Sequence, residues 1–330
     1  MVVHHLRDVH RHLPAEHRIR GLRPRAARNS AARSRNMSRT EPYARTIPHP
    51  LFERMIINDA GTPDEAPWQP ERQHEYGYFP GCVDFMDVEV KFSHLNKGDA
   101  DHASIAAAAI KLMNAAGIDP LILDMNSFKC CGHDPLWQGQ LEVFDELKAH
   151  NLRRMQESGI RTLVVTCAEG YRTFAVDYDL PGQGIQVEHI TQTLRGRGLK
   201  FKSPEPVRVT FHDPCRLGRM MGEYDAPRDL IQLVDGAEMV ELENSREKAL
   251  CCGVSSMMYC NDATKAVRKK RLDQGTDAEI QVMLGGCPKC YMHMQCMLNE
   301  ERMDPGEHNH AFEMLDLMQF LSACLVEEAA

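Results

Sequence analysis

The chain has 330 residues, 43% of them hydrophobic, which is enough for one large domain or two ordinary ones with a proper apolar core. Its 12 cysteines are diluted over this length and grouped in tight pairs, a pattern that favours metal binding over a disulfide scaffold. No run of about 18 uncharged apolar residues occurs, and the N-terminal segment lacks the apolar core of a secretory signal. We therefore expect a cytoplasmic protein without a membrane span.

Charge is distributed unevenly along the chain. The first 45 residues hold 11 Arg against three acidic residues, a balance of +8, whereas the other 285 residues hold 28 Lys and Arg against 44 Asp and Glu, a balance of −16. We interpret residues 1–45 as a disordered basic extension and the proline-rich residues 46–75 as an extended lead-in. Translation from a start ahead of Met37 is one explanation of the extension. A basic arm for nucleic acid is the weaker one, because no nucleic-acid motif accompanies it.

Packed structure is predicted from Tyr76 onward, where short apolar runs alternate with helical patterns. In the first half, strands are expected at residues 76–79, 120–123 and 162–166, and helices at 103–116 and 141–158. In the second half, strands are expected at residues 207–211, 239–242 and 280–284, and helices at 228–234 and 264–274. This alternation predicts an α/β fold with parallel sheets, built as two similar Rossmann-like βαβ halves at residues 76–203 and 204–330.

Two sets of cysteines share one order: a single cysteine after a strand, a Cys-Cys-Gly triplet, and a further cysteine after another strand. The first set is Cys82, Cys130, Cys131 and Cys167. The second set is Cys215, Cys251, Cys252, Cys287 and Cys290. The tails match as well, since His189 lies 22 residues past Cys167 and His310 lies 23 residues past Cys287. Internal duplication is the simplest explanation.

The second set suits an iron–sulfur cluster, because soft thiolates match iron and inorganic sulfide. Loops that follow parallel strands converge at one edge of a sheet, so separate cysteine loops can meet around one cluster. Adjacent cysteines such as Cys251 and Cys252 both reach a large cluster if the backbone bends sharply, and Gly253 permits that bend. A cubane takes four cysteines, so the fifth can bridge two irons in an opened, non-cubane 4Fe-4S cluster. Such a cluster suits disulfide or persulfide chemistry.

Zinc is the main alternative metal. It would use four of the five cysteines in the second set, with Cys287-x-x-Cys290 as one knuckle. Thioredoxin-type exchange at that pair is a weaker hypothesis, because it leaves the vicinal cysteines unexplained. Three cysteines lie outside the repeat and are interpreted as buried apolar residues: Cys260, Cys296 and Cys324.

The tandem order of cysteine, Cys-Cys-Gly and Cys-x-x-Cys resembles the CCG-domain family, whose best-known member is one of the iron–sulfur subunits of heterodisulfide reductase. The resemblance covers residues 76–325 and is complete in the second copy. It implies a duplicated α/β protein with non-cubane four-iron clusters, which exchanges electrons with a ferredoxin-like subunit and works with a flavoprotein in the same complex. The ligands that it implies are Cys215, Cys251, Cys252, Cys287 and Cys290.

The first copy departs from the family pattern, because Gly170 stands where the second cysteine of Cys167-x-x-Cys is expected. Its four thiols are enough for a cubane, a two-iron cluster or a single zinc ion. His133 and Glu169 are candidates to replace the missing ligand, and a degenerate, metal-free site is the remaining alternative. We therefore expect two unlike metal sites.

These features predict an oxidoreductase subunit that acts on sulfur groups, with chemistry favoured at the second-half cluster. A pure electron relay for another dehydrogenase, a zinc-stabilised scaffold, and a redox sensor that contacts nucleic acid are the alternatives. Three basic residues lie beside expected ligands, where their charge would offset that of a cluster and raise its potential: Lys129, Arg216 and Lys289.

Overall fold

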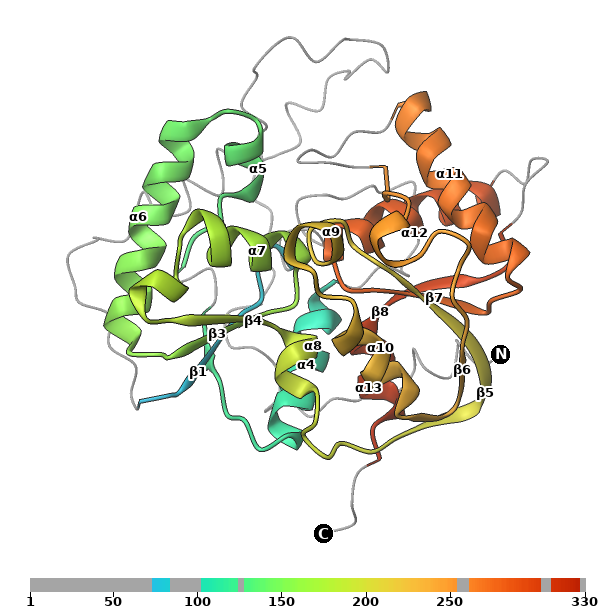
Figure 1. Cartoon of the computed structure of the whole chain (residues 1–330), viewed down its shortest axis with the longest axis horizontal. Helices are drawn as coiled ribbons and strands as arrows, with labels where there is room; N and C mark the ends of the chain where they lie inside the picture. The colour runs from blue at the N-terminus through green and yellow to red at the C-terminus, as the bar shows by residue number, and fades with distance from the viewer. Residues whose placement is uncertain (1–72, 84–101, 124–127, 254–260, 304–309, 327–330) are drawn as a thin grey trace, which may run out of the picture.

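The computed structural model describes residues 73–83, 102–123, 128–253, 261–303 and 310–326. These residues form two four-stranded parallel sheets with helices packed around them (Figure 1). The predicted extension, the lead-in up to residue 72 and Cys260 lie outside the described residues. None of the helices described is both long and apolar enough to cross a lipid bilayer.

The first sheet has the strand order β2-β1-β3-β4, and every neighbouring pair is parallel. Its strands are β1 (Tyr76–Phe79), β2 (Leu121–Ile122), β3 (Thr162–Val165) and β4 (Gln186–His189). Its helices are α4 (Ala103–Ala115), α5 (His133–Trp137), α6 (Leu141–Ser158), α7 (Ala168–Arg172), the π-helical turn η2 (Thr173–Asp177), the 3-10 turn η3 (Pro181–Gln183) and α8 (Ile190–Leu194). Helix α6 ends as predicted at Gly159, whose φ of 69° stops the helix.

The second sheet repeats this arrangement with the order β6-β5-β7-β8. Its strands are β5 (Phe201–His212), β6 (Val234–Met239), β7 (Val282–Gly285) and β8 (Glu313–Asp316). Its helices are α9 (Gly218–Met221), α10 (Asp225–Gln232), the 3-10 turn η4 (Arg246–Lys248), α11 (Asp262–Asp277), α12 (Pro288–Met303) and α13 (Leu317–Cys324). Counted from its own first strand, each sheet has the order 2-1-3-4, which is consistent with two repeated halves.

Two details of the sequence prediction are wrong. The strand expected at residues 239–242 is β6 (Val234–Met239), where Asp235 and Gly236 are poor strand formers and pairing with β5 decides the position. His310 is also not the counterpart of His189. His189 ends β4 and caps α8, and the residue that ends β8 and caps α13 is Asp316.

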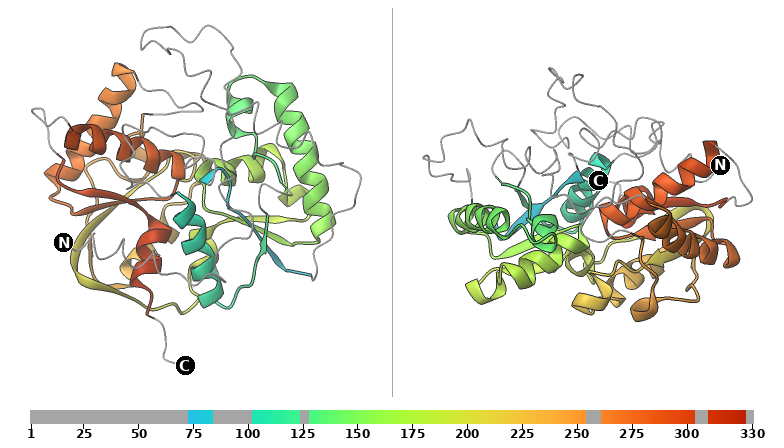
Figure 2. Two further views of the ribbon diagram at one scale, coloured as in Figure 1. Left: turned by 180° about the vertical axis from the view of Figure 1, so that it is seen from behind. Right: turned by 90° about the horizontal axis from the view of Figure 1, so that it is seen from above.

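The two halves contact each other through equivalent helices. Helix α4 packs against α13, and α10, which occupies the place of α4 in the second half, packs against α8. Gln319 of α13 donates a hydrogen bond of 2.7 Å to the Ser104 hydroxyl of α4. Figures 1 and 2 show these helices between the two sheets. This reciprocal packing is the pattern that a pseudo-twofold axis between the halves produces.

Candidate metal centre

The fold brings the single cysteines to the carboxyl ends of the central strands. Cys82 follows β1 and Cys167 follows β3, the two inner strands of the first sheet. In the second sheet, Cys215 follows β5 and Cys287 follows β7, which are again the inner strands. Carboxyl ends of parallel strands are where α/β folds build their sites.

The Cys-Cys-Gly triplets form matching sharp turns in the two halves. Gly132 and Gly253 have φ values of 80° and 82°, in the left-handed region that glycine adopts without strain. The Gly132 amide donates to the Cys130 sulfur at 3.5 Å, and the Gly253 amide donates to Cys251 in the same way. A Cβ on Gly253 would lie 2.4 Å from the carbonyl oxygen of Thr264. The bend predicted at Gly253 is therefore present, and only glycine fits it.

The thiols of each set touch one another. In the second set, hydrogen bonds link the sulfurs in the order Cys215, Cys251, Cys252, Cys290, Cys287. In the first set they link Cys82, Cys130 and Cys131. The fourth thiol of the first set, Cys167, contacts Cys287 of the second set. All of these thiols are free of disulfides.

Hydrogen bonds between neighbouring thiols determine which of them ionises. The pKa of Cys287 lies well below its ordinary value because Cys167 donates to its sulfur, and the pKa of Cys167 is raised well above its own. The pKa of Cys251 is lowered in the same way by donation from Cys215 and Cys252. Packed thiols can therefore ionise only in part, whereas a bound cation deprotonates its thiol ligands. This donor set fits a metal–thiolate group.

Buried nitrogen donors surround the second set. Arg268 donates to the Cys252 carbonyl oxygen at 3.2 Å, and Arg271 donates to His212 Nδ1 at 3.1 Å. Both guanidiniums are fully buried, and each retains a nitrogen without a hydrogen-bond partner, as do His212 and His293 at Nε2. Burial lowers the pKa of His212 to about 3, so its ring is neutral. Unpartnered buried donors of this kind are suited to an anionic metal–sulfur group.

The equivalent place in the first half is neutral. Asn151 of α6 accepts a hydrogen bond of 2.8 Å from the Lys129 amide and donates one of 3.1 Å to the Cys130 carbonyl oxygen. Its side chain thus holds the first Cys-Cys-Gly turn with an amide, where the second half uses the guanidinium of Arg268. The two cysteine sets therefore lie in different electrostatic surroundings.

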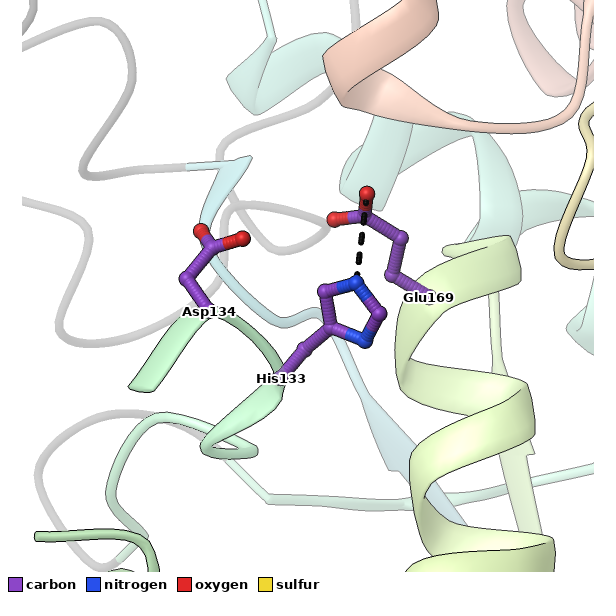
Figure 3. Close-up of side chains that lie close together, drawn as sticks. All are labelled: His133, Asp134 and Glu169. Atoms are coloured by element: carbon purple, nitrogen blue, oxygen red, sulfur yellow. Dashed lines mark ion pairs between the residues drawn. The ribbon is translucent and has the colours of Figure 1, made fainter. Parts of the chain in front are cut away.

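Carboxylates of the first half bind a lysine of the second half. Lys289 Nζ lies 2.5 Å from Asp134 Oδ1 and 2.7 Å from Glu169 Oε2. The His133 ring points toward Glu169, with Nε2 at 3.5 Å from Oε1 (Figure 3). Burial is the main cause that raises the pKa of Glu169 to about 8 and lowers that of His133 to about 2.

His133, Asp134 and Glu169 are spaced so that they could hold a metal ion, with ligand atoms within 4.8 Å of one another. The Lys289 ammonium already contacts both carboxylates, so a cation is present among them. Lys289 was expected to offset the charge of a cluster. Its charge is instead balanced by Asp134 and Glu169.

Gly170 occupies the place of Cys290. The Tyr171 amide donates to the Cys167 carbonyl oxygen at 2.8 Å, and the Tyr291 amide donates to that of Cys287 at 3.0 Å, so both segments begin a helix alike. A Cβ on Gly170 would lie 3.8 Å from Cys167 Cβ and 3.9 Å from Phe174 Cε2, which are ordinary contacts. The site therefore has room for a side chain at residue 170.

Sequence reasoning did not foresee the contacts between the halves. Cys167 and Cys287 occupy the same position in the two repeats, and so do Glu169 and Lys289. Each residue contacts its own counterpart, as residues close to a pseudo-twofold axis do. Alignment of the two repeats was the signal that could have revealed both pairs.

Comparison with known proteins agrees with the repeat. The model of the CCG family, described as a cysteine-rich domain, matches residues 76–174 and 209–295. Similar proteins include one subunit of the dihydromethanophenazine:CoB--CoM heterodisulfide reductase of Methanosarcina barkeri, which is 28% identical over 69% of this chain and 56% of that protein. The EtfAB:quinone oxidoreductase of Syntrophomonas wolfei is 27% identical over 66% of this chain and 30% of that protein.

An iron-sulfur protein of Methanocaldococcus jannaschii is 27% identical over 74% of this chain and 45% of that protein. The chain thus spans about half or less of the length of these relatives. The resemblance inferred from the cysteine order is confirmed, because a heterodisulfide reductase protein is among the relatives found. The two matched segments cover more than half of the sequence, and the chain belongs to the CCG cysteine-rich domain family.

Proposed function

We propose that the chain is the iron–sulfur component of a multi-subunit oxidoreductase related to heterodisulfide reductase. A non-cubane 4Fe-4S cluster in the second half would be held by five thiolates: Cys215, Cys251, Cys252, Cys287 and Cys290. The observation that carries this proposal is the unbroken chain of sulfur contacts among these five residues. The names of the relatives, which include heterodisulfide reductase and an iron-sulfur protein, support it.

The first half would hold a second, different centre. Its ligands would be Cys82, Cys130, Cys131 and Cys167, with either an iron–sulfur cluster or zinc as the metal. Glu169 and His133 remain the candidates for a fifth ligand, although Glu169 would have to leave its contact with Lys289 to bind a metal. The unequal surroundings of the two sets, with Asn151 in one and Arg268 in the other, support two unlike sites.

Electrons would come from a ferredoxin-like partner protein, with a flavoprotein as a further partner. A bound cluster accepts and donates single electrons. Reductive cleavage of a disulfide consumes a pair of electrons and a pair of protons and yields two thiols. In this chain, Arg268 and Arg271 would hold the loops around the cluster and stabilise its negative charge. We also propose a cytoplasmic location and two Rossmann-like repeats at residues 76–203 and 204–330, although β5 starts at Phe201.

A relay without its own substrate is the second candidate. The contact of Cys167 with Cys287 favours it, because two centres joined at this point would pass electrons directly from one half to the other. A zinc-stabilised scaffold is the third, since free thiols also bind zinc.

Anaerobic purification with analysis of iron, sulfide and zinc tests the proposal. Electron paramagnetic resonance before and after reduction by dithionite then reports whether the bound metal takes up electrons. We expect acid-labile sulfide together with iron and a signal that changes on reduction. About one zinc per chain without sulfide would overturn the proposal in favour of the scaffold.

A further inference from the structure

Arg216 is a buried cation that lacks an anion. It follows Cys215 directly and is only 6% exposed. Its Nη1 donates to the Met220 sulfur at 3.1 Å, and its Nε has no hydrogen-bond partner. Within the described residues no carboxylate pairs with it, because Asp177, which feels its charge, is ion-paired with Arg172. A buried guanidinium in this state is costly unless an anion reaches it.

Other buried cations near the site are satisfied by the protein itself. Lys289 lies between Asp134 and Glu169. Arg228 contacts Asp213 at 2.7 Å through a paired guanidinium–carboxylate contact. Arg268 and Arg271 donate to backbone carbonyl oxygens deep in the second half. Arg216 differs from all of these, since its one hydrogen bond goes to a thioether sulfur, which is a weak acceptor.

Arg216 also lies on the more open side of the second cysteine set. Cys215 and Cys251 are partly exposed, whereas the other three thiols of the set are buried. The guanidinium stacks on Trp137 of the first half, with Cζ 3.9 Å from the ring centroid, and Trp137 is 39% exposed. Arg172 adds a second positive charge at 5.3 Å from the same ring. A small molecule approaching Cys215 would therefore meet a guanidinium held flat by an aromatic ring.

We propose that Arg216 and Trp137 form an anion-binding subsite beside the second-half centre. The subsite would take the carboxylate, or an equivalent anionic oxygen group, of a small thiol or disulfide whose sulfur lies at the Cys215 side of the set. Stacking on Trp137 fixes the plane of the guanidinium, and a planar guanidinium binds a carboxylate through two parallel hydrogen bonds. The inference rests on the proposed function, because that function places a sulfur substrate at this centre.

The test uses the anaerobically purified full chain and two ligands that differ in charge alone. Calorimetric titration compares 3-mercaptopropionate with its neutral isostere 3-mercaptopropionamide. We expect the carboxylate to bind about tenfold more tightly, as one charged hydrogen-bonded contact provides. Arg216→Gln should remove this preference, and Arg216→Lys should restore only part of it. Lys202→Gln, which removes one exposed charge from the start of β5, is the matched control and should keep it.

Three results would overturn the subsite. These are equal affinities for the two ligands in the unmodified protein, a preference that survives Arg216→Gln, and a lowered midpoint potential in that variant with the preference intact. The last result would make Arg216 a charge partner of the cluster. If Arg216→Gln does not fold, Trp137→Leu replaces it, and an unchanged preference there also refutes the subsite. Iron and sulfide analysis separates the two proposals, since missing sulfide overturns the function and a full cluster without the preference overturns the subsite alone.

Discussion

The turn at Gly253 provides a sharp test of how the second cysteine set is held. Alanine at this position must adopt a φ of 82°, which costs about 1–2 kcal/mol for a residue with a Cβ. The new Cβ would also lie 2.4 Å from the Thr264 carbonyl oxygen of α11, so either the helix or the turn has to move. Such overpacking costs about 1–3 kcal/mol more. The sum, about 2–5 kcal/mol, is a large part of the about 5–15 kcal/mol that stabilises a typical protein.

Urea denaturation of Gly253→Ala measures this loss, and metal analysis of the same sample shows whether Cys251 and Cys252 still bind. The matched control is Gly196→Ala, because Gly196 has a φ of 74° and no atom lies within 4 Å of the place that its Cβ would take. The control should lose only the backbone part, about 1–2 kcal/mol, and should keep its metal. Equal losses of stability and equal metal contents in the two variants would refute this account of the turn.

Three further predictions concern the interface between the halves and the first site. Gly170→Cys should add a fifth thiolate to the first set and change its Mössbauer spectrum, whereas Gly170→Ala should only stabilise α7 by about 0.5–1 kcal/mol; identical spectra would contradict this. Lys289→Met leaves Asp134 and Glu169 without their cation and should lower the free energy of unfolding by about 3–5 kcal/mol in urea denaturation, with Lys202→Met as the unaffected control. Burial lowers the pKa of His189 to about 4, below its unfolded value of about 6.5, so the unfolded state binds an extra proton between these values and stability falls as the pH drops through this window. His189→Gln should reduce that slope by about 1.4 kcal/mol per pH unit, and an unchanged slope would contradict the assignment.

Elements with clear one-sided patterns were predictable from the sequence. Strand β1 (Tyr76–Phe79) and helix α6 (Leu141–Ser158) have the predicted bounds, because apolar spacing and the glycine after α6 define them. Helix α12 was not foreseen. Every residue from 287 to 296 is buried, so the helix has no polar face and its sequence lacks an amphipathic period. Strand β6 was misplaced because tertiary pairing outweighs the poor strand propensity of Asp235 and Gly236.

Spacing also predicted how the cysteines are grouped within each half, since strand ends and glycine turns are local features. It could not predict the contact between Cys167 and Cys287, because that depends on how the two halves dock. The same docking pairs Lys289 with Glu169 and leaves Arg216 against Trp137. Charges that look alike beside the cysteines in the sequence therefore have different surroundings in the fold.

The most direct test of the central claim compares Cys252→Ala with Cys324→Ala. Both remove one buried thiol, but Cys252 belongs to the second set, whereas Cys324 lies in α13, where burial alone raises its pKa to about 12. Iron and sulfide are measured in each variant after anaerobic purification. The account predicts a loss of about four irons and four sulfides in Cys252→Ala and none in Cys324→Ala. Equal iron and sulfide contents in the two variants would contradict it.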